Sequence, residues 1–204
     1  MNEEPQTPSE DRTPREKERE NGRRLRPVRY IALAGVYAAL LTGGKEALAA
    51  IPNVEVVTLL CALGGYALGA VALASIAAFV TVEGAIYGFG SWIISYYVHW
   101  PLVCAAFMLI RIFVSPQRRV LLRVVPTAAA LILTLGFSAL TSVVDVGILG
   151  GATNAGFFER FTIYYARGIP FYVAQLVTNA VLFPLVFPII AKALIKAKTR
   201  FVCT

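Results

Sequence analysis

Acidic residues are nearly absent from most of this chain. After residue 20 there are five acids, Glu46, Glu55, Glu83, Asp145 and Glu159, and the single histidine is His99. Hydrophobic residues make up 57% of the 204 residues, against about 45–50% in soluble domains. A soluble fold is therefore excluded, because too little polar surface remains to cover a core of this size.

Motifs for nucleotides, metals and catalysis are also missing. Gly44-Lys45 is followed by Glu46, not by the Ser or Thr of a Walker A motif. The sequence has no HExxH motif and no CxxC pair, and one histidine makes a zinc site of the usual type unexpected. Ser91 and His99 could be imagined as a membrane protease pair, but Ser91 lacks a GxSxG setting. We expect neither an enzyme nor a cofactor.

What the chain does contain is a series of long apolar runs. A run of about 20 apolar residues predicts a membrane-spanning helix, because the bilayer offers no water to satisfy the backbone. The sequence predicts six such helices, and only Gly64, Gly65 and Gly69 mark the border between the second and the third. Their ranges are 30–50, 54–69, 70–88, 92–114, 120–147 and 169–195.

Basic residues predict how these helices are threaded. Of 19 Lys and Arg, 16 fall within residues 12–29, 111–123 and 192–200. Six crossings place all three clusters on one side, which the positive-inside rule assigns to the cytoplasm. We therefore expect an all-α membrane protein, a six-transmembrane-helix bundle with both termini cytoplasmic, in a bacterial plasma membrane. The net charge of +7 then reflects topology and anionic lipid, and nucleic acid is not an expected partner.

The chain ends are polar. Residues 1–27 hold four prolines and few apolar residues, which predicts a disordered cytoplasmic tail. Residues 28–198 form the predicted transmembrane domain, and residues 199–204 a second cytoplasmic tail. An alternative is a cleaved signal peptide ending near Ala47-Leu48-Ala49, although the long acidic tail is a poor start for one.

The predicted topology brings the scarce ionisable residues to the outer ends of the helices. Ionisable side chains within a membrane are costly, so Glu55, His99 and Asp145 are candidate site residues. Whether Lys45, Glu46 and Glu83 face a ligand or only pack is left open, since each can also reach the headgroups.

Helical spacing adds polar and aromatic candidates. Two stripes that face each other could line a cavity, or could only join helices through hydrogen bonds of about 0.6 kcal/mol each. The aromatic residues around His99 could stack on a planar ligand, or form an ordinary interface belt. The first stripe is Thr134, Ser138, Thr141 and Asp145, the second is Tyr172, Gln175 and Asn179, and the aromatic group is Trp92, Tyr96, Tyr97 and Trp100.

Small residues recur on the first predicted helix. Gly35, Ala39, Gly43 and Ala47 are spaced by four, beside Ala34-xxx-Ala38. Such faces let helix backbones approach closely, either within the bundle or on another membrane subunit.

These features together resemble the substrate-binding S component of an energy-coupling factor transporter. The resemblance covers residues 28–198 and rests on Ala34-xxx-Ala38 and on two strings, GKEALAAIPNVE over 44–55 and EGAIYGFG over 83–90. It implies uptake of a vitamin or precursor, bound in an outward-facing cavity. It also implies docking through the first helix onto a transmembrane scaffold subunit that is driven by two cytoplasmic ATPases.

On this reading each candidate residue has an expected role. The expected substrate contacts are Glu55, Trp92, Tyr96, His99, Trp100, Asp145, Tyr172, Gln175 and Asn179, and the expected docking residues are Ala34, Gly35, Ala38 and Ala39. A self-sufficient secondary transporter is the main alternative, although no internal repeat is visible, and a structural membrane protein is another. Thiamine-like, riboflavin-like, queuosine-precursor and cobalamin-type substrates all fit the residues.

Overall fold

The computed structural model describes residues 14–51, 55–150 and 156–203, and every regular element in these ranges is helical. The helices are α1 (Pro14–Leu48), α2 (Val57–Leu63), the π-helix η1 (Gly64–Leu68), α3 (Ala70–Tyr87), α4 (Ser91–Phe113), α5 (Leu121–Gly150) and α6 (Phe157–Cys203). The predicted all-α class is confirmed for the described residues.

Five of the helices are long and apolar enough to cross a bilayer. These spans are Pro27–Leu48, Ala70–Tyr87, Ser91–Phe113, Leu121–Ile148 and Phe157–Phe201. The sixth predicted helix, over 54–69, is the shorter segment Val57–Leu68. At 1.5 Å per residue it extends about 18 Å, against about 30 Å for a hydrocarbon core.

Glycine explains why this sixth segment is short and irregular. Gly64 and Gly65 open η1, and Gly69 ends it with a φ of 70°. Only glycine adopts that backbone conformation without a steric penalty, so the chain turns there and begins α3. The predicted border between residues 69 and 70 is confirmed.

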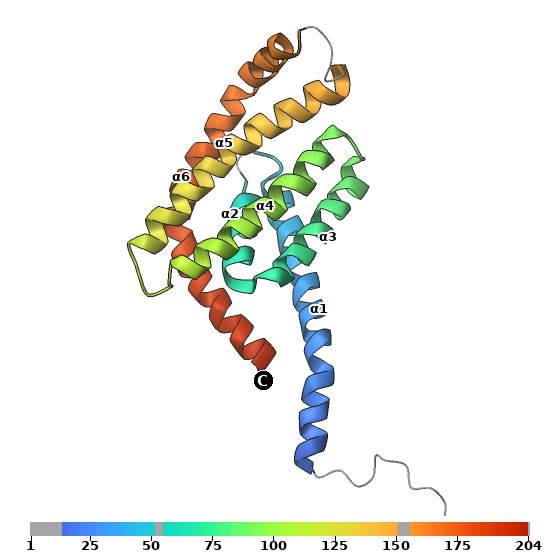
Figure 1. The fold of residues 1–204 in the computed structure, drawn as a ribbon, viewed down its shortest axis with the longest axis vertical. Helices are drawn as coiled ribbons and strands as arrows, with labels where there is room; N and C mark the ends of the chain where they lie inside the picture. Colours follow the sequence, from blue (N-terminus) through green and yellow to red (C-terminus); the bar gives the residue numbers. More distant parts are fainter. Residues whose placement is uncertain (1–13, 52–54, 151–155, 204) are drawn as a thin grey trace, which may run out of the picture.

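The helices run alternately up and down the bundle (Figure 1). The start of α1, the turn between α4 and α5, and the C-terminal end of α6 lie toward the lower end in this view. The basic clusters 111–123 and 192–200 therefore share this end with the described start of α1. That this end is the cytoplasmic one stays a prediction.

Two chain ends differ from the prediction. The α1 helix begins at Pro14, so residues 14–27 are helical where the sequence predicted disorder, while residues 1–13 lie outside the described ranges. Proline suits the first turn of a helix, because a backbone N–H at that position would have no intrahelical partner. The α6 helix spans Phe157–Cys203, beyond the predicted 169–195, so residues 199–203 extend a helix and are not a tail.

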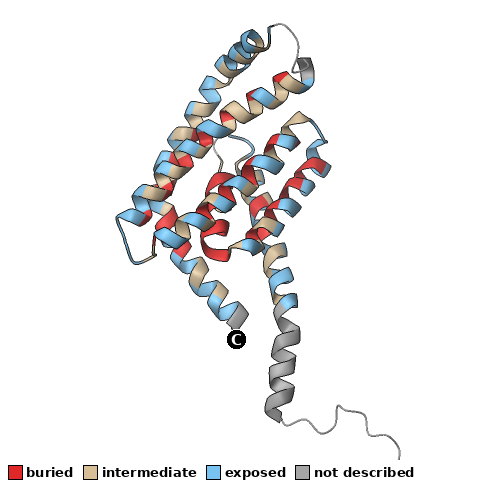
Figure 2. Cartoon of the chain, in the orientation of Figure 1, coloured by how far each residue is buried: buried red, intermediate tan, exposed pale blue. Residues whose placement is uncertain are grey.

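Buried residues concentrate on α2, η1 and the inward faces of α3 and α4 (Figure 2). A cluster of Tyr66, Phe107, Phe183 and Phe187 joins η1, α4 and α6, with ring centroids 5.4–5.8 Å apart. Large apolar side chains are also exposed on every long helix, for example Ile31, Ile112 and Ile189 at 71–74%. Such a surface suits lipid tails and not water.

Gly65 brings the backbones of η1 and α4 together. A Cβ atom added at Gly65 would lie 2.2 Å from the carbonyl oxygen of Cys104, which is backbone and cannot move aside alone. We expect Gly65→Ala to lower the thermal unfolding temperature of the detergent-purified protein by several degrees. Gly136→Ala is the matched control, since no described atom lies within 4 Å of its added Cβ. Equal unfolding temperatures for the two variants would contradict this role of Gly65.

Candidate functional site

Glu55 lies inside the bundle because α2 is short. It precedes α2 in a loop, outside the five candidate spans, and α2 begins at mid-height in Figure 1. The Thr58 hydroxyl donates to Glu55 Oε1 over 2.8 Å, and Gln175 Nε2 of α6 donates to the same oxygen over 3.4 Å. The structure thus brings together two predicted contacts that are 120 residues apart.

Burial raises the pKa of the Glu55 carboxyl to about 7, although the Thr58 hydroxyl and the Lys45 charge act in the opposite direction. Neighbouring groups therefore compensate only part of the cost of holding a charge there. A ligand that donates a hydrogen bond or carries positive charge would stabilise the ionised form.

The two predicted polar stripes face each other. Asn179 Nδ2 of α6 donates to Thr134 Oγ1 of α5 over 2.9 Å, and the hydroxyls of Ser142 and Tyr172 lie 3.4 Å apart. Thr134, Ser142 and Asn179 are all buried. The Asn179–Thr134 contact confirms that the two predicted stripes meet at this point, whereas Ser142 was not among the predicted residues. Both contacts also fit the alternative that the stripes only join the helices.

Sequence reasoning missed Ser142. It continues the spacing of four from Thr134 and Ser138, and it is 1% exposed, whereas the predicted Thr141 and Asp145 are only half-buried. All three hydroxyls of this buried row donate to the carbonyl oxygen four residues earlier. Extending the four-residue step in the sequence would have found Ser142.

Aromatic side chains form a column along α4. Trp92, Tyr96 and Trp100 are spaced by four, with successive ring centroids 5.0 and 5.4 Å apart. His99 and Trp100 are each 2% exposed and lie 4.6 and 5.5 Å from the ring of Phe137 on α5. The column therefore points into the bundle and not to a lipid interface.

Three polar atoms of this region lack a hydrogen-bond partner within the described residues. They are Ser95 Oγ and Trp100 Nε1 on α4, and Asn179 Oδ1 between α5 and α6, and all three are buried. Buried polar atoms are normally satisfied by protein, water or ligand. Each is therefore available to a bound molecule or a water.

Asp145 has a structural partner. Ser91, the first residue of α4, donates through Oγ to Asp145 Oδ1 over 2.5 Å. A carboxylate beside a helix N-terminus also stabilises the helix dipole. Asp145 joins α5 to α4, and its contact with a substrate stays a prediction.

Lys45 and Glu83 form an ion pair between α1 and α3. Glu83 is fully buried, and the Lys45 side chain is 24% exposed. Lys45 Nζ also lies 4.6 Å from the ring centroid of Tyr87, 5.9 Å from Trp92 and 5.8 Å from Tyr96. The pair thus lies next to the aromatic column. The sequence alone left open where the Lys45 and Glu83 side chains point.

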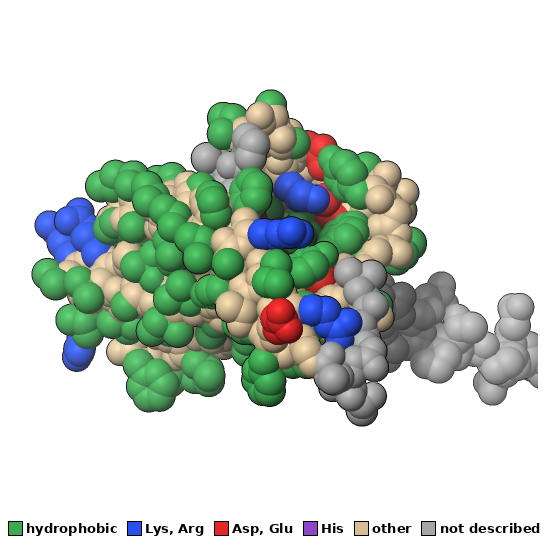
Figure 3. Space-filling view, turned by 90° about the horizontal axis from the view of Figure 1, so that it is seen from above, with side chains coloured by type: hydrophobic (Ala, Val, Ile, Leu, Met, Phe, Trp, Pro, Cys, Tyr) green, Lys and Arg blue, Asp and Glu red, His purple; other side chains and the backbone are tan. Residues whose placement is uncertain are grey.

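Glu46 contacts the same tyrosine as Lys45, but at its hydroxyl and not at its ring. The Tyr87 hydroxyl contacts both Glu46 carboxylate oxygens at 2.7–2.8 Å, in an exposed position. Seen from above, acidic and basic side chains gather around a recess in an otherwise apolar surface (Figure 3). Side chains of both charges therefore lie together at this end of the bundle.

The α1 helix separates the predicted docking residues into two groups. Gly35 and Ala39 are exposed, as are Gly43 and Ala47, while Ala34 and Ala38 are half-buried. On the opposite side Tyr37 and Leu41 are buried, and the Tyr37 hydroxyl donates to the carbonyl of Leu60 over 2.6 Å. The stripe of four exposed small residues, spaced by four, is uncovered in this chain.

Comparison with known proteins finds no match, whether to family models, to curated proteins or to solved structures. The likeness to an S component therefore rests on the residues quoted for it.

Removing one partner of the Lys45–Glu83 pair leaves a buried charge alone. We expect Lys45→Met to destabilise the bundle by about 3–5 kcal/mol. Adding Glu83→Leu in the same chain should restore most of this loss, because no charge then remains buried. Denaturant unfolding of Lys45→Met, Glu83→Leu and the double variant Lys45→Met/Glu83→Leu measures the coupling between the two residues. If the losses of unfolding free energy in the two single variants simply add in the double variant, the ion pair is contradicted.

Proposed function

We propose that this chain is the substrate-specific component of an energy-coupling factor importer, which binds a vitamin or related micronutrient from outside the cell. It delivers the ligand in complex with a transmembrane scaffold subunit and two cytoplasmic ATPases. The chain itself hydrolyses nothing, in keeping with the missing nucleotide motif.

The contact of Glu55 with Gln175 is the observation that supports this most. The half-buried carboxylate of Glu55 and the amide of Gln175, 120 residues apart in sequence, meet inside an apolar bundle. The aromatic column of α4 and the unsatisfied Asn179 Oδ1 lie on the helices around it. Ligand sites are commonly apolar and aromatic with a few convergent polar groups.

The chemistry of these groups favours a planar ligand with N–H donors or positive charge. Aromatic rings can stack on such a molecule, while Glu55 accepts its hydrogen bonds. Lys45, paired with Glu83 and partly exposed, can contact an acidic or carbonyl group of the same ligand. A heteroaromatic vitamin has both kinds of group.

The exposed face of α1 supports docking onto a partner subunit. Gly35, Ala39, Gly43 and Ala47 present little more than backbone, so another helix can approach closely. The buried face of the same helix, with Tyr37 and Leu41, holds it to the bundle.

Substrate binding can be tested without knowing the ligand in advance. The protein is purified from bacterial membranes in mild detergent, and small molecules are extracted and identified by mass spectrometry. We expect Glu55→Gln and Asn179→Ala to retain about tenfold less ligand, because a hydrogen bond to a charged or buried group is lost. Glu159→Gln, an exposed acid at the start of α6, is the control and should retain as much as the wild type. Equal retention by all of these chains would remove this site.

Docking is tested by co-purification with the scaffold subunit of the same cell. We expect Ala39→Leu to abolish co-purification, since a larger side chain keeps the two helix backbones apart. Ala105→Leu makes the same change at an exposed position of α4 and should leave the complex intact. Ligand retention should be unchanged in both variants. A complex that survives Ala39→Leu would count against this face.

A further inference from the structure

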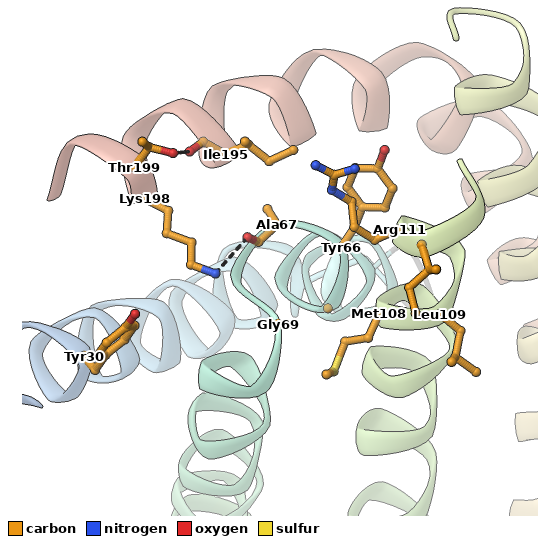
Figure 4. Close-up of a pocket in the computed structure, with 12 residues that line it drawn as sticks. Tyr30, Tyr66, Ala67, Gly69, Met108, Leu109, Arg111, Ile195, Lys198 and Thr199 are labelled. Atoms are coloured by element: carbon orange, nitrogen blue, oxygen red, sulfur yellow. Dashed lines mark hydrogen bonds between the residues drawn. The ribbon is translucent and has the colours of Figure 1, made fainter. Parts of the chain in front are cut away.

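A large cavity lies at the end of the bundle opposite the proposed substrate site. Its volume is about 630 Å³, and it opens between α1 near Tyr30, η1, and the C-terminal parts of α4 and α6 (Figure 4). The proposed function does not use it. Its polar lining includes Tyr66, Arg111, Lys198 and Thr199.

Two cations from different helices reach this cavity. Lys198 extends from α6 toward η1, where its Nζ donates to the carbonyl of Ala67 over 3.4 Å (Figure 4). The same Nζ also donates to the carbonyl of Leu68 over 2.8 Å. The Arg111 guanidinium of α4 lies 5.3 Å from the ring centroid of Tyr66. A lysine has three donors and an arginine five, so both cations keep donors for another acceptor.

The charged side chains that line the cavity are positive. Among the described residues that line it there is no Asp or Glu to neutralise Arg111 and Lys198. The basic clusters 111–123 and 192–200 lie toward the same end of the bundle. Charge complementarity therefore favours an anion.

An apolar groove adjoins the cavity and shares Lys198 with it. The groove has a volume of about 250 Å³ and lies between α1 and α6, lined by Leu33, Val36, Leu68, Leu194 and Phe201 among others. Val36 is 70% exposed and Phe201 46%, so the groove is open to the outside of the bundle. An anion with an attached hydrocarbon chain would occupy both spaces.

The surrounding surface places the cavity near the edge of the apolar belt. Leu109, Ile112 and Phe113 on α4 are 58–77% exposed, and the basic residues Arg118 and Arg119 follow within one short turn. In a bilayer, phosphate groups lie at this transition between apolar and basic surface. Basic pockets between transmembrane helices on the cytoplasmic side are known to suit anionic headgroups.

We propose that this cavity binds the headgroup of an anionic phospholipid, whose phosphate contacts Arg111 and Lys198 while one acyl chain lies in the groove between α1 and α6. The lipid bridges α1, η1, α4 and α6 at their basic ends. A ligand that binds only the folded state stabilises it by mass action. The site depends on the chain's residence in a bilayer and not on any substrate at the opposite end.

The full chain, purified and delipidated in mild detergent, is titrated with phosphatidylglycerol, phosphatidylcholine or inorganic phosphate. Native mass spectrometry and the unfolding temperature report binding. We expect phosphatidylglycerol to bind at one site and to raise the unfolding temperature, and the other two probes to do neither. A surface cation contributes about fivefold to such binding, so Arg111→Gln should weaken it by about that factor, and Arg111→Gln/Lys198→Gln further.

Two matched controls distinguish binding in the cavity from the effects of net charge and of side-chain size elsewhere. Arg118→Gln/Arg119→Gln removes the same charge from exposed positions outside the cavity and should leave binding unchanged. Ala197→Trp fills the groove without changing charge and should weaken phosphatidylglycerol binding, whereas Ala193→Trp, on the same helix but outside the groove, should not. This pair keeps the test valid if Lys198→Gln fails to fold, since Lys198 also holds the carbonyl of Leu68.

Three results would overturn the proposal. Equal binding of phosphatidylcholine would show that charge is not recognised, and equal stabilisation by inorganic phosphate would show an anion site without a lipid chain. Equal losses in Arg111→Gln/Lys198→Gln and Arg118→Gln/Arg119→Gln would show that net charge alone is sensed.

Discussion

Polar side chains in this bundle have to find their partners inside it. The long helices expose large apolar residues on their outer faces, so a polar group on a helix either reaches a helix end or pairs within the bundle. The contacts of Glu55 with Gln175, Asn179 with Thr134, and Lys45 with Glu83 all follow from this constraint. Each joins side chains from two different segments of the chain.

The short α2–η1 segment makes room for that polar interior. A full-length second helix would fill the upper half of the bundle with its own side chains. Because α2 begins only at Val57, Glu55 precedes it outside the helix and reaches Gln175 of α6. The close contact of Gly65 with the backbone of α4, and the turn at Gly69, hold the segment in place.

The two ends of the molecule have different chemistry. One end combines the aromatic column of α4 with mixed charge, which suits a small ligand that carries both donors and acceptors. The other end carries basic residues around a cavity and an apolar groove, which suits a lipid. The exposed small-residue stripe of α1 runs between them.

Composition and periodicity alone determined the helical class, five of the spanning helices and the stripes on α5 and α6, because these depend on residues near one another in sequence. The border at Gly69 was readable for the same reason. Tertiary structure decided the length of α2, the extent of α1 and α6, and the burial of Ser142 in place of Thr141. It also decided the pairing of Lys45 with Glu83 and the cavity beside Arg111 and Lys198. All of these features depend on how separate helices pack. A hydropathy pattern shows which face of a helix is buried, but it does not show which side chain of another helix lies opposite that face.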